Sequence, residues 1–313
     1  MGARLRSNEG MVDRCPVCDA ESTPRLQIPN PFLETIDPLD VNECTSCRLL
    51  HVSNEVTVAD LDVVYGRGDD AEWNSYYETT DFEARAKAER AVVDLRALLA
   101  PTDLPVVDVG FGFGHFLEEF ARGGPPEVIG QEFSTVPLAR AEARGIRVVK
   151  ELDELEPGSC SAAVMLDVAE HVIDANQTFR EINRVLAPGG IVYVHTPRRC
   201  MWDSLAAWLC RRGIRRVPLV WLKTRVSIAH LRLWSDDALQ TSLERSGFVV
   251  ESYKRELELS WPVRRYIHIY LTHRVPSAPL GRLLELVLAS LVAVPLRLGL
   301  LRNKAIVVAR KRE

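Results

Sequence analysis

The sequence predicts an α/β fold, a doubly wound and mostly parallel sheet preceded by a small separate unit. From about residue 101, short apolar runs alternate with helical segments, which is the pattern of a parallel sheet covered by helices on both faces. Two closely spaced pairs of cysteines lie before this alternation begins. The 313 residues, 47% of them hydrophobic, are enough for one large core and a small accessory unit.

A glycine-rich turn follows the first strand of the predicted sheet. The strand over 106–109 contains an acid, alternate glycines follow, and a helix is expected over 116–121. The acid and the glycines are Asp108, Gly110, Gly112 and Gly114. Glycines let the backbone approach a ligand closely, and a helix start offers unpaired N–H groups. A nicotinamide or flavin fingerprint would have its third glycine at the position of His115, and no Gly-Lys-Ser/Thr of a phosphate loop follows. The turn therefore favours a different cofactor over a strand-to-helix turn without a ligand.

The second and third strands continue the alternation. The second, over 128–132, ends in Glu132, 22 residues after Gly110. An acid at this place in a dinucleotide-binding fold accepts hydrogen bonds from ribose hydroxyls, although a solvated acid at a strand end would look the same. A helix over 137–144 and a strand over 146–149 come next.

A fourth strand leads into a group of ionisable residues. It covers 162–166 and is followed by Asp-Val-Ala-Glu-His-Val, which contains Asp167, Glu170 and His171. A helix over 175–186 and an Ala-Pro-Gly-Gly turn precede a fifth strand over 191–197, in which His195 lies.

Taken in order, these motifs resemble those of class I S-adenosylmethionine-dependent methyltransferases, and the Asp-x-x-Glu-His-Val stretch is similar to that of the ubiquinone-pathway enzymes. The resemblance covers residues 85–313. It implies a Rossmann-like sheet of seven strands, in which the last strand, over 305–310, runs antiparallel between strands five and six. It also implies methyl transfer from S-adenosylmethionine, with donor-binding roles for Asp108, Gly110, Gly112, Gly114, Glu132 and Asp167.

Three histidines are candidates for the base that a hydroxyl acceptor requires. His171 follows the strand-four acid, and His195 ends strand five. His230 matches a family pattern, H-l-r-x-f-s, that precedes a helix over 236–246. His171 is equally compatible with a packing role at a helix start.

A divalent cation is a further expectation at the end of strand four. Asp167, Glu170 and His171 resemble the E-x-x-E-H set with which ubiquinone-pathway O-methyltransferases bind such a cation. The first acid is Asp here instead of Glu, and its shorter reach weakens the expectation.

The N-terminal cysteines form two Cys-x-x-Cys pairs that are separated by 25 residues. They are Cys15, Cys18, Cys44 and Cys47. Two such pairs predict a tetrahedral zinc site, and four thiolates leave no coordination position for water, so the zinc would be structural. Unligated cysteines and a redox pair are the alternatives. Cys160, Cys200 and Cys210 are single and are interpreted as small apolar residues.

The chain divides into predicted parts with distinct roles. These are a flexible tail over 1–12, a zinc ribbon over 13–55, a helical connector over 56–100, and a methyltransferase domain over 101–313 with an acceptor-side insertion over 198–232 and an apolar helix over 280–301. Pro295 and the charges in the apolar helix argue against a membrane span and favour packing on the sheet. The aromatic stretch 73–77 of the connector could cover the acceptor pocket or pack between helices.

The predicted insertion over 198–232 is strongly basic. It has nine Lys/Arg and one acid, Asp203, interleaved with Trp and Leu, whereas the whole chain has a net charge of −4. This composition is typical of an interfacial helix and also suits the phosphate of a lipid- or nucleotide-linked substrate, RNA phosphates, or a face that contacts only water. The acidic remainder of the chain argues against nucleic acid.

The sequence therefore predicts an S-adenosylmethionine-dependent O-methyltransferase that acts on a small-molecule, glycan or lipid-linked acceptor. We expect a cytoplasmic location with peripheral contact at the inner face of the membrane, since no apolar stretch follows Arg4 and Arg6 as in a secretory signal. An RNA methyltransferase and a non-catalytic protein of the same fold that binds S-adenosylmethionine are the alternatives.

Overall fold

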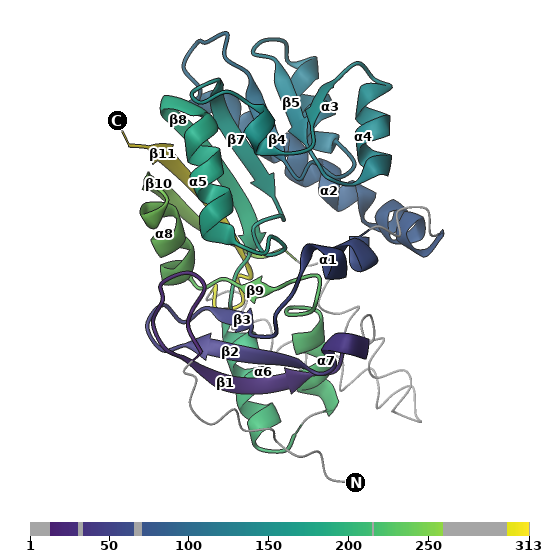
Figure 1. Ribbon diagram of the computed structural model, residues 1–313, viewed down its shortest axis with the longest axis vertical. Coiled ribbons are helices and arrows are strands. Elements are labelled where there is room, and N and C mark those ends of the chain that lie inside the picture. The colour runs from purple at the N-terminus through teal and green to yellow at the C-terminus, as the bar shows by residue number, and fades with distance from the viewer. Residues whose placement is uncertain (1–12, 31–33, 66–70, 215, 259–298, 313) are drawn as a thin grey trace, which may run out of the picture.

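The computed structural model describes residues 13–30, 34–65, 71–214, 216–258 and 299–312 (Figure 1). The expected tail and residues 280–298 of the expected apolar helix lie outside these ranges, as does Arg215. Two sheets organise the described chain, a large one in the upper part of Figure 1 and a small one in the lower part.

The large sheet has seven strands in the order β10-β11-β8-β7-β4-β5-β6. In chain order they are β4 (Val106–Val109), β5 (Val128–Gln131), β6 (Arg147–Val149), β7 (Cys160–Leu166), β8 (Leu186–Pro197), β10 (Phe248–Glu256) and β11 (Lys304–Lys311). The strands from β8 to β6 are parallel, and β11 runs antiparallel to both β8 and β10. The predicted Rossmann-like sheet and its antiparallel last strand are confirmed.

Helices cover both faces of this sheet because alternate strand residues face opposite sides. One apolar core joins the sheet to α2 (Ala71–Leu98), α3 (His115–Arg122) and α4 (Thr135–Glu142), and a second joins its other face to α5 (Ala175–Val185) and α8 (Asp236–Arg245). On β4, for example, Val106 belongs to the first core and Val107 to the second.

The fifth strand differs from its prediction at its start. We expected it over 191–197, but β8 begins at Leu186, directly after α5, and pairs there with Cys160 of β7. The register between the two strands shifts before Ile191, and Gly189 has a φ of 72°. The Pro-Gly-Gly stretch is therefore an irregularity inside a strand, where the positive φ favours glycine.

The small sheet has the order β1-β2-β3-β9, with antiparallel neighbours throughout. Its strands are β1 (Ser22–Ile28), β2 (Leu39–Cys44), β3 (Leu50–Val52) and β9 (Arg232–Leu233). The last of these comes from the C-terminal half of the chain. Helices α6 (Met201–Arg211) and α7 (Arg216–Lys223) share an apolar core with this sheet, so the predicted insertion packs on the N-terminal unit.

The remaining elements are short. A 3-10 helix, η1 (Glu34–Ile36), connects β1 and β2, α1 (Val58–Tyr65) follows β3, and η2 (Leu152–Glu154) precedes β7. In the part of the chain that the structure describes, no helix has the length and apolar character needed to cross a bilayer.

Candidate functional site

The predicted glycine loop connects β4 to α3 in a conformation that requires glycine. Gly110, Gly112 and Gly114 have φ angles of 66°, 52° and 78°, values in the left-handed region that glycine adopts without a steric penalty. A Cβ at Gly110 would also lie 2.8 Å from a methyl group of Val168, the residue after Asp167. The loop and the end of β7 therefore touch at the carboxyl edge of the sheet.

Two acids lie beneath this loop. Glu132, after β5, accepts hydrogen bonds from the backbone N–H groups of Gly112 at 3.2 Å, Phe133 at 2.9 Å and Ser134 at 3.0 Å. Asp108 is buried, and this burial together with the Glu132 carboxylate raises its pKa well above the ordinary value. The pair suits a ligand that brings hydroxyl donors and a positive charge.

Asp167 takes part in a partly buried ion cluster. Its carboxylate accepts hydrogen bonds from Lys304 Nζ at 2.7 Å, from His195 Nδ1 at 2.9 Å and from Lys87 of α2. Burial alone would raise the pKa of Asp167, but the charges of Lys304, Lys87 and His195 hold it well below its ordinary value.

Glu258 closes the ion cluster on the opposite side of His195. Its Oε2 lies 3.3 Å from His195 Nε2, and its Oε1 lies 3.5 Å from Lys304 Nζ. Burial lowers the pKa of His195, but Asp167 and Glu258 outweigh it and raise that pKa above the usual value. His195, only 3% exposed, therefore keeps its proton to a higher pH than a solvated histidine.

A second cluster contains Glu170, His171 and His230, whose ligand atoms all lie within 4.8 Å of one another. His171 Nε2 is 3.6 Å from Glu170 Oε1, and the two imidazole rings meet edge to face with centroids 4.7 Å apart. Glu170 is fully buried, and its Oε2 accepts a hydrogen bond from Thr196 at 2.8 Å. Its Oε1 has no hydrogen-bond partner among the residues that the structure describes.

The composition of this second cluster differs from the expected cation ligands. Asp167 was expected beside Glu170 and His171, but it bonds the lysines of the ion cluster, and His230 stands in its place. Burial, followed by the influence of His171, lowers the pKa of His230 to about 3, so its imidazole is neutral at physiological pH. A buried carboxylate and two imidazoles fit a divalent transition-metal ion.

The four N-terminal cysteines meet as predicted from their spacing. The Sγ atoms of Cys15, Cys18, Cys44 and Cys47 all lie within 4.8 Å of one another. The Sγ distance is 3.6 Å between Cys15 and Cys47 and 3.4 Å between Cys18 and Cys44. The residue after each pair, Asp19 or Arg48, has a left-handed backbone, so the two pairs turn in the same way. Four converging thiols of this kind fit a tetrahedral metal ion.

The basic insertion is less exposed than its sequence indicated. Arg198 pairs with Asp236, Arg199 with Glu43 and Arg225 with Asp203, and Arg232 is buried. Arg211, Arg212 and Lys223 are exposed. Of the nine cations in the insertion, Arg198, Arg199, Arg225 and Arg232 therefore serve the fold, and the sequence did not distinguish them from the exposed ones.

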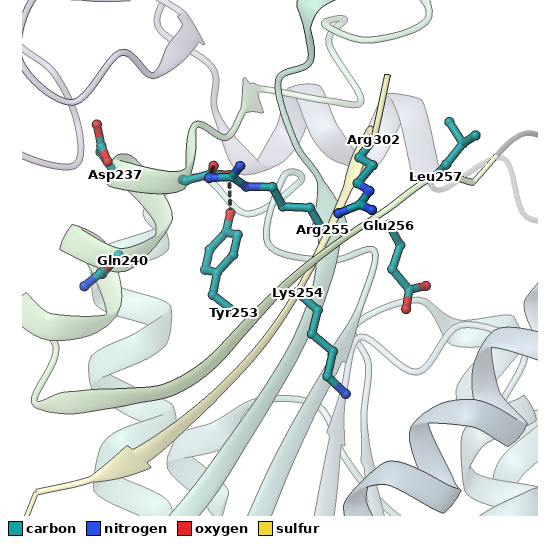
Figure 2. Close-up of a pocket in the computed structure, with 9 residues that line it drawn as sticks. Asp237, Gln240, Tyr253, Lys254, Arg255, Glu256, Leu257 and Arg302 are labelled. Atoms are coloured by element: carbon teal, nitrogen blue, oxygen red, sulfur yellow. Dashed lines mark hydrogen bonds and ion pairs between the residues drawn. The ribbon is translucent and has the colours of Figure 1, made fainter. Parts of the chain in front are cut away.

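A surface hollow of about 910 Å³ lies at the β10 edge of the large sheet (Figure 2). Its lining comes from α8, β10 and the segments next to β10 and β11, and Tyr253 donates a hydrogen bond to Asp236 at 2.7 Å. Three strands, β11, β8 and β7, separate β10 from β4, whose end carries the glycine loop. None of the predicted site residues lines this hollow.

The strand order, the glycine loop after β4 and the acid after β5 define a class I methyltransferase fold. The chain belongs to the family described as methyltransferase domain, whose model matches residues 83–253, more than half of the chain. This confirms the class predicted from the sequence.

Several known proteins are similar to parts of the chain. The ubiquinone biosynthesis O-methyltransferase of Sodalis glossinidius is 32% identical over 114 residues, which are 33% of this chain and 44% of that protein. An uncharacterized methyltransferase of Mycobacterium sp. is 35% identical over 96 residues, 29% of this chain and 38% of that protein. The chain thus spans less than half the length of each of these relatives. Among solved structures, an S-adenosylmethionine-dependent methyltransferase from Mesorhizobium loti has 24% identity and a TM-score of 0.43, with 70% of this chain and 96% of that chain covered.

Three residues of the ion cluster were not predicted from the sequence. Lys87, Glu258 and Lys304 come from α2, from the segment after β10 and from the start of β11. Lys304 alone had a signal, as the charged residue immediately before an apolar final strand.

Proposed function

We propose that the chain transfers a methyl group from S-adenosylmethionine to a hydroxyl oxygen of a small-molecule, glycan or lipid-linked acceptor. The observation that carries this proposal is the contact between Gly110 and Val168, because it sets the donor loop beside the ion cluster and the histidines. The named activity of the ubiquinone-pathway relatives supports oxygen as the acceptor atom.

The donor would lie over the glycine loop. We assign the ribose hydroxyls to Glu132, which already accepts three backbone hydrogen bonds there. Asp108, buried and hard to ionise, would gain a compensating charge from the cationic donor. Gly110, Gly112 and Gly114 would allow the backbone to approach the amino-acid end of the donor, and Asp167 would bound the site on the β7 side.

The acceptor proton would go to a histidine while the sulfonium methyl moves in line to the acceptor oxygen. We assign this role first to His171, because it follows the strand-four acid and its Nε2 lies 3.6 Å from the Glu170 carboxylate. His195 is the second candidate, although both of its ring nitrogens face carboxylates. His230, neutral and edge to face with His171, is the third.

Two metal ions belong to the proposal. A divalent cation held by Glu170, His171 and His230 would supply Lewis-acid activation of an acceptor hydroxyl. With the cation bound, the base would be His195, because imidazoles that ligate a metal cannot also accept the proton. A zinc ion held by the four N-terminal cysteines would be structural, since four thiolates complete its coordination.

Peripheral membrane contact is proposed through one face of α6. Met201, Leu205 and Trp208 recur at helical spacing and are 41%, 37% and 44% exposed. Arg211 and Arg212 follow, and the guanidinium of Arg212 lies over the Trp208 ring. An apolar stripe beside cations suits an anionic lipid surface that would present a lipid-linked acceptor.

The acceptor class can be tested with methyl-labelled S-adenosylmethionine supplied together with a lipid extract, a small-molecule extract or total RNA. The proposal expects label in a lipid or small-molecule product and none in RNA. Label in RNA alone would replace the proposal with RNA methylation. Donor binding without label in any fraction would support a non-catalytic role.

A further inference from the structure

Arg232 of β9 is buried, only 3% exposed, and it bridges two parts of the molecule. Its guanidinium donates hydrogen bonds to the carbonyl oxygens of Ala169 at 3.3 Å and Ile173 at 2.7 Å. Those two carbonyls flank Glu170 and His171. The side chain therefore fixes both ends of the segment that carries two members of the Glu170, His171 and His230 cluster.

The backbone of β9 is attached to the cysteine unit. Arg232 pairs with His51 and Leu233 with Leu50 of β3, a strand that begins three residues after Cys47. The Ser235 hydroxyl donates a hydrogen bond to the carbonyl of Cys47. His230 lies two residues before β9, so the third member of the cluster is on the segment that leads into this strand.

The positive charge of Arg232 suits a position near a negatively charged metal centre at the cysteines. Its guanidinium lies over the ring of Trp234, which belongs to the same apolar core as Cys15, Cys44 and Cys47. A divalent ion bound by four thiolates has a net charge of −2, whereas four protonated thiols have none. The metal centre would thus supply a counter-charge to a guanidinium that is removed from water.

We propose that Arg232 is a positioning residue that couples the four-cysteine metal centre to the Glu170, His171 and His230 cluster, so that the cluster takes its working arrangement only when the metal is bound. This inference rests on the proposed metal at the cysteines and goes beyond its structural role. The donor loop leads into α3, which packs in the other main core of the sheet through Phe116 and Phe120, so donor binding should be independent of the coupling.

The test compares wild type with Arg232→Gln, with the cysteine site loaded with Co²⁺ for absorption spectroscopy and with one equivalent of Cd²⁺ for the other measurements, because Cd²⁺ is diamagnetic and prefers thiolates to imidazoles and carboxylates. The readouts are the thiolate-to-cobalt absorption band, the NMR signals of the His171 and His230 rings, and the affinity for S-adenosylhomocysteine. We expect Arg232→Gln to shift both ring signals and to release the metal to a chelator about tenfold faster. Removing the metal from wild type should shift the same two signals in the same direction, while the affinity for S-adenosylhomocysteine changes by less than about twofold.

Arg184→Gln is the matched control. Arg184 also donates to two backbone carbonyls, those of Leu152 and Leu155, on a segment remote from the cysteines. This variant should leave the cobalt band and both ring signals at their wild-type positions. Arg232→Lys, which keeps the charge and loses the two-armed geometry, should fall between wild type and Arg232→Gln.

The outcomes separate the coupling from the metal proposal. No thiolate-to-cobalt band in wild type would overturn the metal site itself. The coupling would be overturned if the thiolate-to-cobalt band is present but the His171 and His230 ring signals change neither on metal removal nor in Arg232→Gln. The metal-free protein could lose S-adenosylhomocysteine binding simply by unfolding. In that case the metal-loaded Arg232→Gln protein provides the test of the coupling. Ring signals and a rate of metal release equal to those of wild type would then contradict the proposal.

Discussion

The donor side and the acceptor side of this protein are assembled in different ways. The proposed donor residues Asp108 to Glu132 come from two neighbouring strands and the turns that follow them, within 25 residues of sequence. The acceptor side draws on α2, β7, β8, β11 and the segments next to β9 and β10. A site of the first kind can be recognised as a motif in the sequence. The residues of a site of the second kind come together only when the chain folds.

The largest expected effect is on the donor side. Gly110→Ala would place a Cβ 2.8 Å from Val168 at a φ of 66°, so the loop must move. We expect the affinity for S-adenosylmethionine, measured by calorimetry, to fall by about 100-fold, roughly 2.7 kcal/mol. Gly124→Ala is the control, because Gly124 has a φ of 76° but open space around its Cβ position. Gly124 lies after α3 and outside the donor loop, so equal affinity losses in both variants would show that general strain in the fold, and not the contact between the loop and Val168, causes the loss.

Next in size is the effect of removing the cysteine metal. Cys44→Ala deletes one of four converging thiols, and metal binding to such sites contributes directly to folding. We expect a large fall in Tm in calorimetry and loss of bound zinc by elemental analysis. Cys160→Ala, which truncates a buried cysteine outside the cluster, should retain zinc and lower Tm much less. Retention of zinc by Cys44→Ala would contradict the four-thiolate site.

The ion cluster predicts a smaller, pH-dependent effect. Burial lowers the folded-state pKa of His195, but the Asp167 carboxylate raises it more, so that this pKa lies above 6.5. Its contribution to the free energy of unfolding is therefore full below about pH 6.5 and is lost as pH rises through the folded-state pKa. Asp167→Asn should lower the pKa of His195 in an NMR titration, and Lys304→Met, which removes a nearby positive charge, should raise it. A His195 pKa that ignores both changes would mean that the acceptor side is not held together electrostatically.

The smallest expected effect concerns the exposed face of α6. Trp208→Ser should weaken co-sedimentation with anionic liposomes several-fold, and salt should weaken it further through Arg211 and Arg212. Val93→Ser, at an apolar residue of α2 that is 69% exposed, is the control and should have no effect. Equal liposome binding by wild type, Trp208→Ser and Val93→Ser would contradict the proposed membrane contact of α6.

The same contrast explains how much could be predicted from the sequence. The positions of the glycine loop after β4 and of Glu132 after β5, and the convergence of the cysteine pairs, could be predicted because each depends on local spacing and strand periodicity. Asp167 was grouped with Glu170 and His171 because they are neighbours in sequence, yet its carboxylate faces Lys87 and Lys304, which are 80 and 137 residues away. Composition likewise indicated a basic surface over 198–232, and only the fold shows that Arg198, Arg199 and Arg225 face carboxylates.

The small sheet gives a further example of what spacing alone does not predict. Strand β9 has two residues, Arg232 and Leu233, too few for any periodicity to be recognised. It forms because β3 offers an edge on which the chain can pair. The connection between the cysteines and the histidines runs through this strand.

Calorimetric titration of S-adenosylmethionine into the full chain tests the central claim most directly, because every assignment above depends on the donor loop. The account predicts saturable binding of one donor per chain at micromolar concentration, with Glu132→Ala weakened and Val93→Ser unchanged. No binding heat at millimolar S-adenosylmethionine, from a protein that is folded, would contradict it.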